Sequence, residues 1–193
     1  MELIFATQNK NKVEEIRHQL SQKIQVKSLL DLNYLDELEE TQETLEGNAI
    51  QKVEFVSNKF GTNCFADDTG LEVMSLGGAP GVYSARYAGE EKSFEKNMDK
   101  LLEALKDSSD RKAQFRTAIA LIYEGKQYLF EGICKGEIIK SKKGEKGFGY
   151  DPIFQPEGYS QTFAEMSLDE KAKIGHRGIA VQKLIDFLNA QAV

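Results

Sequence analysis

The spacing of hydrophobic and polar residues predicts how the chain begins to fold. The apolar run 3–6 indicates a short strand, the polar stretch 7–12 indicates a turn, and Val13, Ile16 and Leu20 then recur at helical spacing. We therefore expect a strand, a loop and a helix, in that order, at the start of the chain.

A second amphipathic helix is predicted just before Gly61, a residue type that commonly ends a helix in the left-handed conformation. Further helices are expected over residues 94–106 and near the end of the chain, where Val181, Leu184 and Leu188 share one stripe. The apolar positions of the helix before Gly61 are Leu45, Ala49, Val53, Val56 and Phe60.

The alternation typical of a strand is clearest over residues 113–123, and after a turn at 124–126 the segment 127–134 continues extended, which predicts a β-hairpin. Segment 63–76 is predicted to be a strand interrupted by an acidic turn, with two carboxylates at a strand end, and 143–152 to be a loop. A hairpin excludes an all-parallel sheet. The pattern therefore predicts an α/β protein with a mixed twisted sheet and flanking helices.

Length and composition favour one folded domain spanning residues 1–193, since most domains have about 100–200 residues. No apolar stretch reaches the roughly 18 residues that span a bilayer, and the first residues lack the features of a secretory signal. We expect a soluble cytoplasmic protein. Cys64 and Cys134 lack metal-site spacing, so we expect both to be reduced, buried packing residues.

The formal net charge of -6 argues against a surface that binds a nucleic-acid polymer, because such surfaces are usually dominated by basic residues. Basic residues nevertheless form local groups. Lys10 with Lys12, and Lys171 with Lys173 and Arg177, could focus the field on one small polyanion. The lysines between 140 and 146 are more simply explained as a solvated run.

The turn at 7–12 is a candidate phosphate site. It lies between a predicted strand and a predicted helix, where unpaired backbone N–H groups and the helix dipole favour phosphate oxygens. Lys12 would add a point charge. Thr7 and Asn9 could donate hydrogen bonds to the same oxygens, or they could simply cap the helix.

Asp67 and Asp68 form a candidate metal site, because adjacent carboxylates are costly unless a cation shares their field. Mg²⁺ is the natural candidate, since it takes oxygen ligands and bridges carboxylates to substrate phosphates. One member of the acidic run at 37–40 could converge on the same ion. The alternatives are an acidic turn at 67–70 and a solvated loop at 37–40.

Residues 147–152 combine two glycines, two aromatic residues and a carboxylate. This composition suits a loop that places an aromatic ring and a hydrogen-bond acceptor next to a planar base. A tight structural turn is the alternative. Lys171, His176 and Arg177 precede the last predicted helix and could donate to oxygens. His18 lies on the polar side of its helix, and we expect it to be exposed and without a role.

Taken together, these segments closely resemble the inosine triphosphate pyrophosphatase family, in order and over nearly the whole chain. The resemblance implies hydrolysis of non-standard purine triphosphates such as ITP, dITP and XTP to the monophosphate and pyrophosphate. The matching segments are ATQNKNK (6–12), EET (39–41), ADDTGLEV (66–73), GGAPGVYSARY (77–87), GFGYDPIF (147–154) and GHR (175–177).

The resemblance also implies a role for each matched residue. Asp68 would accept a proton from the attacking water and bind Mg²⁺, Glu40 would be a second metal ligand, Thr69 would contact substrate, and Asp67 is a plausible helper. The triphosphate would be held by Thr7, Gln8, Asn9, Lys10, Asn11 and Lys12. The base pocket would comprise Phe148, Gly149, Tyr150 and Asp151, with Lys171, His176 and Arg177 reaching base and phosphates.

The fold implied by the resemblance is an elongated mixed-sheet α/β protein whose two lobes flank a central substrate cleft, and members of the family usually form homodimers. Gln8 and Gly175 depart from the commonest family pattern, in which glycine and serine are frequent at these positions. Neither departure removes a charged group, so we expect them to affect base preference more than hydrolysis.

Three other classes of function fit the sequence less well. A catalytically silent nucleotide-binding sensor would keep the phosphate loop and the base pocket, but it would not need Asp67, Asp68 and Glu40. A P-loop phosphotransferase is excluded, because the chain has no G-x-x-x-x-G-K-[ST] motif. An RNA-binding module is disfavoured by the acidic charge balance.

Overall fold

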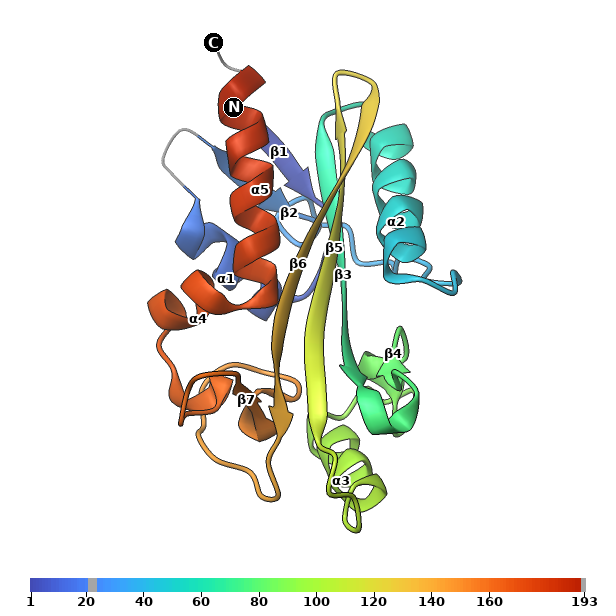
Figure 1. Ribbon diagram of the computed structural model, residues 1–193. Coiled ribbons are helices and arrows are strands. Elements are labelled where there is room, and N and C mark those ends of the chain that lie inside the picture. The colour runs from blue at the N-terminus through green and yellow to red at the C-terminus, as the bar shows by residue number, and fades with distance from the viewer. Residues whose placement is uncertain (21–23, 192–193) are drawn as a thin grey trace. The chain divides into compact units, whose positions relative to one another are not determined.

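The computed structural model describes residues 1–20 and 24–191 and has a mixed α/β architecture (Figure 1). The helices are α1 (Lys10–Gln19), α2 (Leu45–Phe60), α3 (Phe94–Ala104), α4 (Leu168–Ile174) and α5 (His176–Gln191). The strands are β1 (Glu2–Phe5), β2 (Gln25–Ser28), β3 (Cys64–Val73), β4 (Pro80–Gly81), β5 (Lys112–Tyr123), β6 (Lys126–Ile138) and β7 (Phe154–Pro156). Short 3₁₀ helices occupy Met74–Leu76, Ser84–Arg86, Asp151–Ile153 and Phe163–Glu165.

The strands are hydrogen-bonded in the order β2-β1-β3-β5-β6-β7, and β4 pairs with β3. β1 runs parallel to both β2 and β3, as expected where a helix connects one strand to the next, whereas the β3–β4 and β6–β7 pairs are antiparallel. The prediction of a mixed sheet with flanking helices is therefore confirmed.

The chain divides into two compact units. Unit 1 comprises Met1–Asp68, Thr117–Gly132 and Arg177–Val193, and unit 2 comprises Thr69–Arg116 and Ile133–His176. The strands β3, β5 and β6 contribute residues to both units. Each unit has its own hydrophobic core.

Unit 1 packs helices on both faces of its strands, with α1 and α5 on one face and α2 on the other (Figure 1). The alternation along β1 explains this arrangement, because Leu3 and Phe5 enter the α1 and α5 core while Ile4 enters the α2 core. The Phe5 ring stacks on Phe65 with centroids 4.5 Å apart. Both faces of the central strands are therefore buried.

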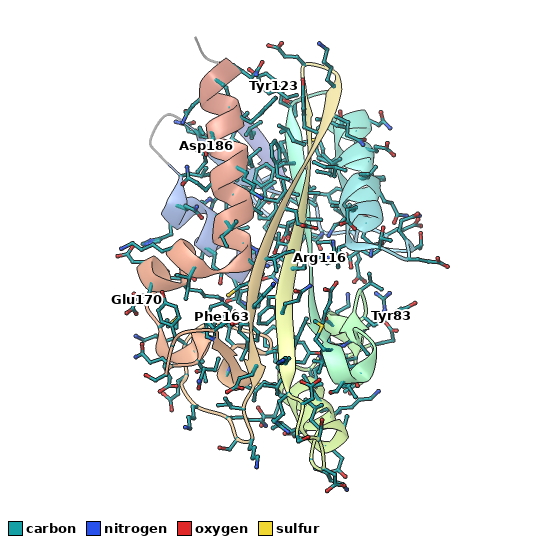
Figure 2. All side chains as sticks on the ribbon, viewed as in Figure 1. Tyr83, Arg116, Tyr123, Phe163, Glu170 and Asp186 are labelled. Atoms are coloured by element: carbon teal, nitrogen blue, oxygen red, sulfur yellow. The ribbon has the colours of Figure 1, made fainter. Side chains whose placement is uncertain are left out.

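Unit 2 has an aromatic core. The ring of Phe115 lies 4.7 Å from that of Phe154 and 5.9 Å from that of Phe163, which is labelled in Figure 2. Met98 and Leu101 bring α3 into the same cluster. This core supports the loop that precedes Asp151 in the sequence.

Several predicted boundaries are confirmed. Gly61 ends α2 in the left-handed conformation with φ 62°, and Thr44 caps its start by accepting from the Gly47 N–H. The hairpin is formed by β5 and β6 around Glu124 and Gly125, whose φ values of 49° and 74° suit a two-residue hairpin turn. Both cysteines are buried and free, and His18 is exposed, as predicted.

Other boundaries were predicted wrongly. β3 runs through Asp67 and Asp68 without interruption, so the predicted acidic turn does not form and the two carboxylates lie within the strand instead of at its end. α1 begins at Lys10, inside the predicted turn. Lys171 lies in α4, which was not predicted, while His176 and Arg177 are the first residues of α5 and do not precede it. Among the described residues, no helix combines the length and apolarity needed to cross a bilayer.

Candidate functional site

The start of α1 is closed by its own side chains. Asn9 caps the helix, because its Oδ1 accepts from the N–H groups of Asn11 at 3.0 Å and Lys12 at 3.3 Å. Thr7 Oγ1 accepts from the Asn9 N–H at 3.1 Å. The capping role that the sequence left open for Thr7 and Asn9 is therefore present in the structure.

Gln8 connects this loop to a second one. Its Nε2 donates to the backbone oxygens of Tyr34 at 3.1 Å and Asp36 at 2.8 Å. Lys10 is exposed, whereas Lys12 is half-buried. A glycine at position 8 could not make the contacts to residues 34–36, so the departure from the family pattern adds a link between two loops.

Asp67 lies on the face of β3 that is covered by α1 and α5. Its side chain is 1% exposed and accepts hydrogen bonds from Lys12 Nζ at 2.9 Å and Arg177 Nε at 3.2 Å. Burial opposes ionisation, but the charges of Lys12 and Arg177 outweigh it and hold the Asp67 pKa well below its usual range. Arg177 also binds Glu15, so α5 is joined to α1 through the same guanidinium.

Asp68 points to the opposite face of β3, as successive strand residues do. Its Oδ2 accepts from Asn48 Nδ2 of α2 at 3.0 Å. Burial raises the pKa of Asp68, the charge of Lys52 opposes that rise, and the negative charge of Glu40 adds to it, so the pKa lies above its usual value. Adjacent aspartates thus have oppositely shifted pKa values.

Lys52 was missed by the sequence analysis. Its Nζ donates to Glu40 Oε1 at 2.6 Å and to the backbone oxygen of Asp67 at 2.7 Å. Burial lowers its pKa, but the charges of Glu40, Asp68 and Asp67 outweigh that effect and raise it. A signal was present, because a lysine at position 52 falls within the buried stripe of the predicted helix, where an unpaired charge would be costly.

The carboxylates of unit 1 have the chemistry of a hard-cation site. Glu40 is stabilised in its ionised form, since burial raises its pKa but Lys52 and Lys12 lower it by more. No cluster of three or more His, Cys, Asp or Glu side chains suited to a metal occurs within residues 1–20 and 24–191. A pair of carboxylates still fits Mg²⁺, which typically takes one or two of them and completes its shell with water and phosphate oxygens.

The candidate base pocket belongs to unit 2 and is organised by Lys171. Its Nζ lies 2.7 Å from Asp151 Oδ2 and sits 5.0 Å from the centroid of the Phe148 ring and 5.5 Å from that of Phe163. The same Asp151 oxygen accepts from the Phe148 N–H at 3.0 Å. A Cβ on Gly147 would fall 2.0 Å from Asp151 Oδ2, so only glycine allows this turn.

Among the remaining predicted residues of unit 2, Tyr150 and His176 are buried and contact other residues of the same unit. Tyr150 donates its hydroxyl to the Ser84 backbone oxygen at 2.6 Å, and burial raises its pKa far above the usual value. His176 is 3% exposed, and its ring stacks on Phe115 at 4.5 Å. Gly149 adopts φ 62°, and Thr69 is half-buried.

The predicted residues therefore form one group within each unit. The first surrounds Asp67 and Asp68, and the second surrounds Lys171 and Asp151. The group of unit 1 is Thr7, Gln8, Asn9, Lys10, Asn11, Lys12, Glu40, Asp67, Asp68 and Arg177, and the group of unit 2 is Thr69, Phe148, Gly149, Tyr150, Asp151, Lys171 and His176.

Comparison with known proteins identifies close relatives over the full length. The model of the Ham1 family matches residues 3–187. A dITP/XTP pyrophosphatase of Flavobacterium johnsoniae is 57% identical over 190 residues, covering 98% of this chain and 99% of that protein. The solved structure of the Staphylococcus aureus Ham1 protein is similar with a TM-score of 0.88 and 40% identity over 99% of this chain and 100% of that chain.

A HAM1 protein of Coxiella burnetii gives a TM-score of 0.89 with 37% identity, over 98% of this chain and 99% of that chain. The predicted resemblance and the predicted fold class are both confirmed by these matches.

Proposed function

Because the chain belongs to the Ham1 family, we propose that it hydrolyses non-standard purine nucleoside triphosphates such as dITP, ITP and XTP to the monophosphate and pyrophosphate. This activity would clear such nucleotides from the pool before they enter DNA or RNA. The observation that carries the proposal is the buried Asp68, whose pKa is raised and which lies in the field of the Glu40–Lys52 ion pair in unit 1. The similarity of the chain to dITP/XTP pyrophosphatases supports the same activity.

Asp68 is the proposed proton acceptor for the attacking water. A general base works best when its pKa approaches the working pH, and burial moves the pKa of Asp68 in that direction. Lys12 and Lys52 supply positive charge for phosphate oxygens. Phosphoanhydride hydrolysis needs charge neutralisation and an aligned water, so no covalent intermediate is required.

Mg²⁺ is the proposed cofactor, held by Glu40 and Asp68. When bound, it would neutralise phosphate charge and lower the pKa of a coordinated water. The donor set fits, because Mg²⁺ prefers carboxylate oxygens. The negative charge of Glu40 raises the pKa of Asp68, and a cation bound by both carboxylates would offset that repulsion.

Recognition of the base is proposed for the Lys171 group of unit 2. Phe148 offers a ring on which a purine can stack, and Lys171, His176 and Arg177 are the proposed donors to oxygens of base and phosphates. Thr69, Gly149, Tyr150 and Asp151 would complete the contacts. Lys10 and the capped loop at 7–12 would hold the triphosphate with Lys12.

Two further proposals follow from the family. We place the protein in the cytoplasm, where the nucleotide pool that it would act on is found, and we propose that it works as a homodimer, as members of this family usually do. Sedimentation equilibrium of the purified protein tests the second proposal, since a single species at the monomer mass would contradict it.

Product analysis tests the activity. Purified protein is incubated with Mg²⁺ and a panel of dITP, XTP, ITP, dGTP and ATP, and the products are separated by ion-exchange chromatography. We expect monophosphate and pyrophosphate from dITP, XTP and ITP, and at least about ten-fold slower turnover of ATP. Release of phosphate and diphosphate would show a different reaction, and binding without turnover would identify a nucleotide sensor.

A further inference from the structure

Asn48 is a side chain of α2 that contacts Asp68. It is 1% exposed and lies at the end of the first turn of the helix, where Nδ2 donates to Asp68 Oδ2 at 3.0 Å. Figure 1 shows α2 lying along β3 within unit 1, and the hydrogen bond to Asp68 places Asn48 beside the middle of that strand. A polar residue this deeply buried needs partners for both ends of its amide.

The amide of Asn48 is held in one orientation by its second partner. Its Oδ1 accepts from the backbone N–H of Gln42 at 2.9 Å. A backbone N–H can only donate, so the amide end that faces Gln42 must be the oxygen and the end that faces Asp68 must be the NH₂ group. The hydrogen bond to Asp68 therefore always has the carboxylate as acceptor.

This hydrogen bond distinguishes the two oxygens of Asp68. Oδ2 accepts from the Asn48 amide, whereas Asn48 makes no such bond to Oδ1. The bond also limits rotation of the carboxylate about its Cβ–Cγ bond.

Asn48 also fixes the segment that carries Glu40. Gln42 follows Glu40 by two residues, and one turn further along α2 the side chain of Lys52 binds Glu40 directly at 2.6 Å. Residues four apart share a helix face, so one face of α2 contacts both carboxylates: Asn48 binds Asp68 and Lys52 binds Glu40. Gly47 makes the close approach possible, because a Cβ there would lie 2.8 Å from the Cβ of Gln42.

We propose that Asn48 is a positioning residue for hydrolysis: it holds the carboxylate of Asp68 in one orientation, and it anchors the Glu40 segment beside it. This inference rests on the proposed function, since it concerns the carboxylate proposed to act on the attacking water.

The test replaces Asn48 by leucine, which has nearly the same size but neither donates nor accepts. Steady-state kinetics of Asn48→Leu with dITP and saturating Mg²⁺ should give a kcat lowered by at least 30-fold as an order of magnitude, with KM within about three-fold of the wild type. Asn48→Asp should be at least as impaired, because a carboxylate there would face Asp68 with like charge.

A matched control uses another asparagine of unit 1. Asn63 caps the hairpin by accepting from the Glu124 N–H at 2.9 Å and precedes β3, several residues from Asp68. Asn63→Leu should lose stability but keep kcat within about two-fold. Thermal melts of all variants report folding, and Asn48→Ser serves as the kinetic test if Asn48→Leu does not fold.

Each outcome is decisive. A folded Asn48→Leu or Asn48→Ser protein with a kcat within about three-fold of the wild type would overturn the inference, as would a rise in KM with kcat unchanged. Wild-type protein that releases no pyrophosphate from dITP would instead refute the proposed function, and this inference with it. A kcat loss in Asn63→Leu as large as in Asn48→Leu would show a general effect of lost stability.

Discussion

Lys12 and Asp67 form a buried ion pair that joins the first turn of α1 to the middle of β3, with Nζ 2.9 Å from Oδ1. The aspartate is 1% exposed and the lysine 14% exposed, so neither charge is well screened by water. Arg177 approaches the other oxygen of Asp67 at 3.2 Å. One carboxylate thus orients two of the cations assigned to phosphate binding.

We predict that Lys12→Met both weakens substrate binding and destabilises the fold. Breaking a buried pair leaves an uncompensated carboxylate, which costs on the order of 3 kcal/mol, although Arg177 reduces the loss here. The double variant Lys12→Met, Asp67→Asn should regain most of that stability and none of the substrate affinity. Urea unfolding and KM for dITP measure the two effects, and recovery of both would assign Lys12 a structural role alone.

Asp68→Asn is predicted to abolish turnover without loss of stability. Burial raises the pKa of Asp68, so the stability that this carboxyl contributes is lost as the pH rises through that pKa, because the ionised form pays a desolvation cost in the folded protein. An amide removes this cost, and its oxygen can still accept from Asn48. We expect kcat to fall by about 1,000-fold or more with an equal or higher Tm at pH 7.5. Turnover within ten-fold of the wild type would remove Asp68 from the mechanism.

The fold could be predicted from the sequence wherever periodicity was strong. The stripe of α2 ended at Gly61 as expected, and the alternation over 113–123 gave the hairpin. β2, β7 and α4 were missed, because segments of four, three and seven residues are too short to show a period, and β2 lacks the apolar run that identified the equally short β1. These short elements depend on pairing and packing with distant parts of the chain.

The candidate site, like the fold, could be predicted only where the local sequence carried the signal. An acidic turn that interrupts the strand was predicted around Asp67 and Asp68. The side chains that bind the two carboxylates within the continuous strand come from segments far away in sequence, namely Lys12, Arg177 and Asn48. Lys52 was not considered, although it falls on the buried side of the predicted helix. Only the three-dimensional arrangement shows that α2 contributes two polar side chains to the acidic group.

Two glycines with positive φ should respond differently to alanine. Gly61 has φ 62° with open space where the methyl group of an alanine would project, whereas at Gly144, with φ 88°, a Cβ would lie 2.4 Å from the backbone carbon of Ala164. Gly61→Ala should cost about 1 kcal/mol, the conformational penalty alone. Gly144→Ala should cost several times more, because backbone atoms must move. Urea unfolding compares the two, and equal losses would contradict the close approach of residues 144 and 164.

Both cysteines should resist alkylation in the native protein. Burial raises the pKa of Cys64 and of Cys134 to about 11, and the thiolate is the reactive form. At pH 8 the thiolate fraction would be on the order of 0.1%, and buried sulfurs are also shielded from reagent. Mass spectrometry after brief iodoacetamide treatment should find unmodified protein, and two adducts once urea is added. Rapid native labelling would show that a thiol is accessible.

The last prediction concerns the Phe148 ring, which lies beneath Lys171 with Nζ 5.0 Å from its centroid. Stacking on an aromatic ring contributes about 1–3 kcal/mol per base and differs little between purines. Phe148→Ala should therefore lower kcat/KM by roughly ten-fold or more for ITP and ATP alike, leaving their ratio unchanged. The ratio itself should favour ITP, because a 6-oxo group accepts from the basic side chains while a 6-amino group leaves a buried donor unpaired. Phe94→Ala is the matched control: Phe94 is 43% exposed and its ring lies 6.2 Å from that of Phe148, so its removal should change kcat/KM by less than about three-fold. If Phe148→Ala alters the ratio of ITP to ATP while Phe94→Ala does not, Phe148 selects the base and does not merely stack on it.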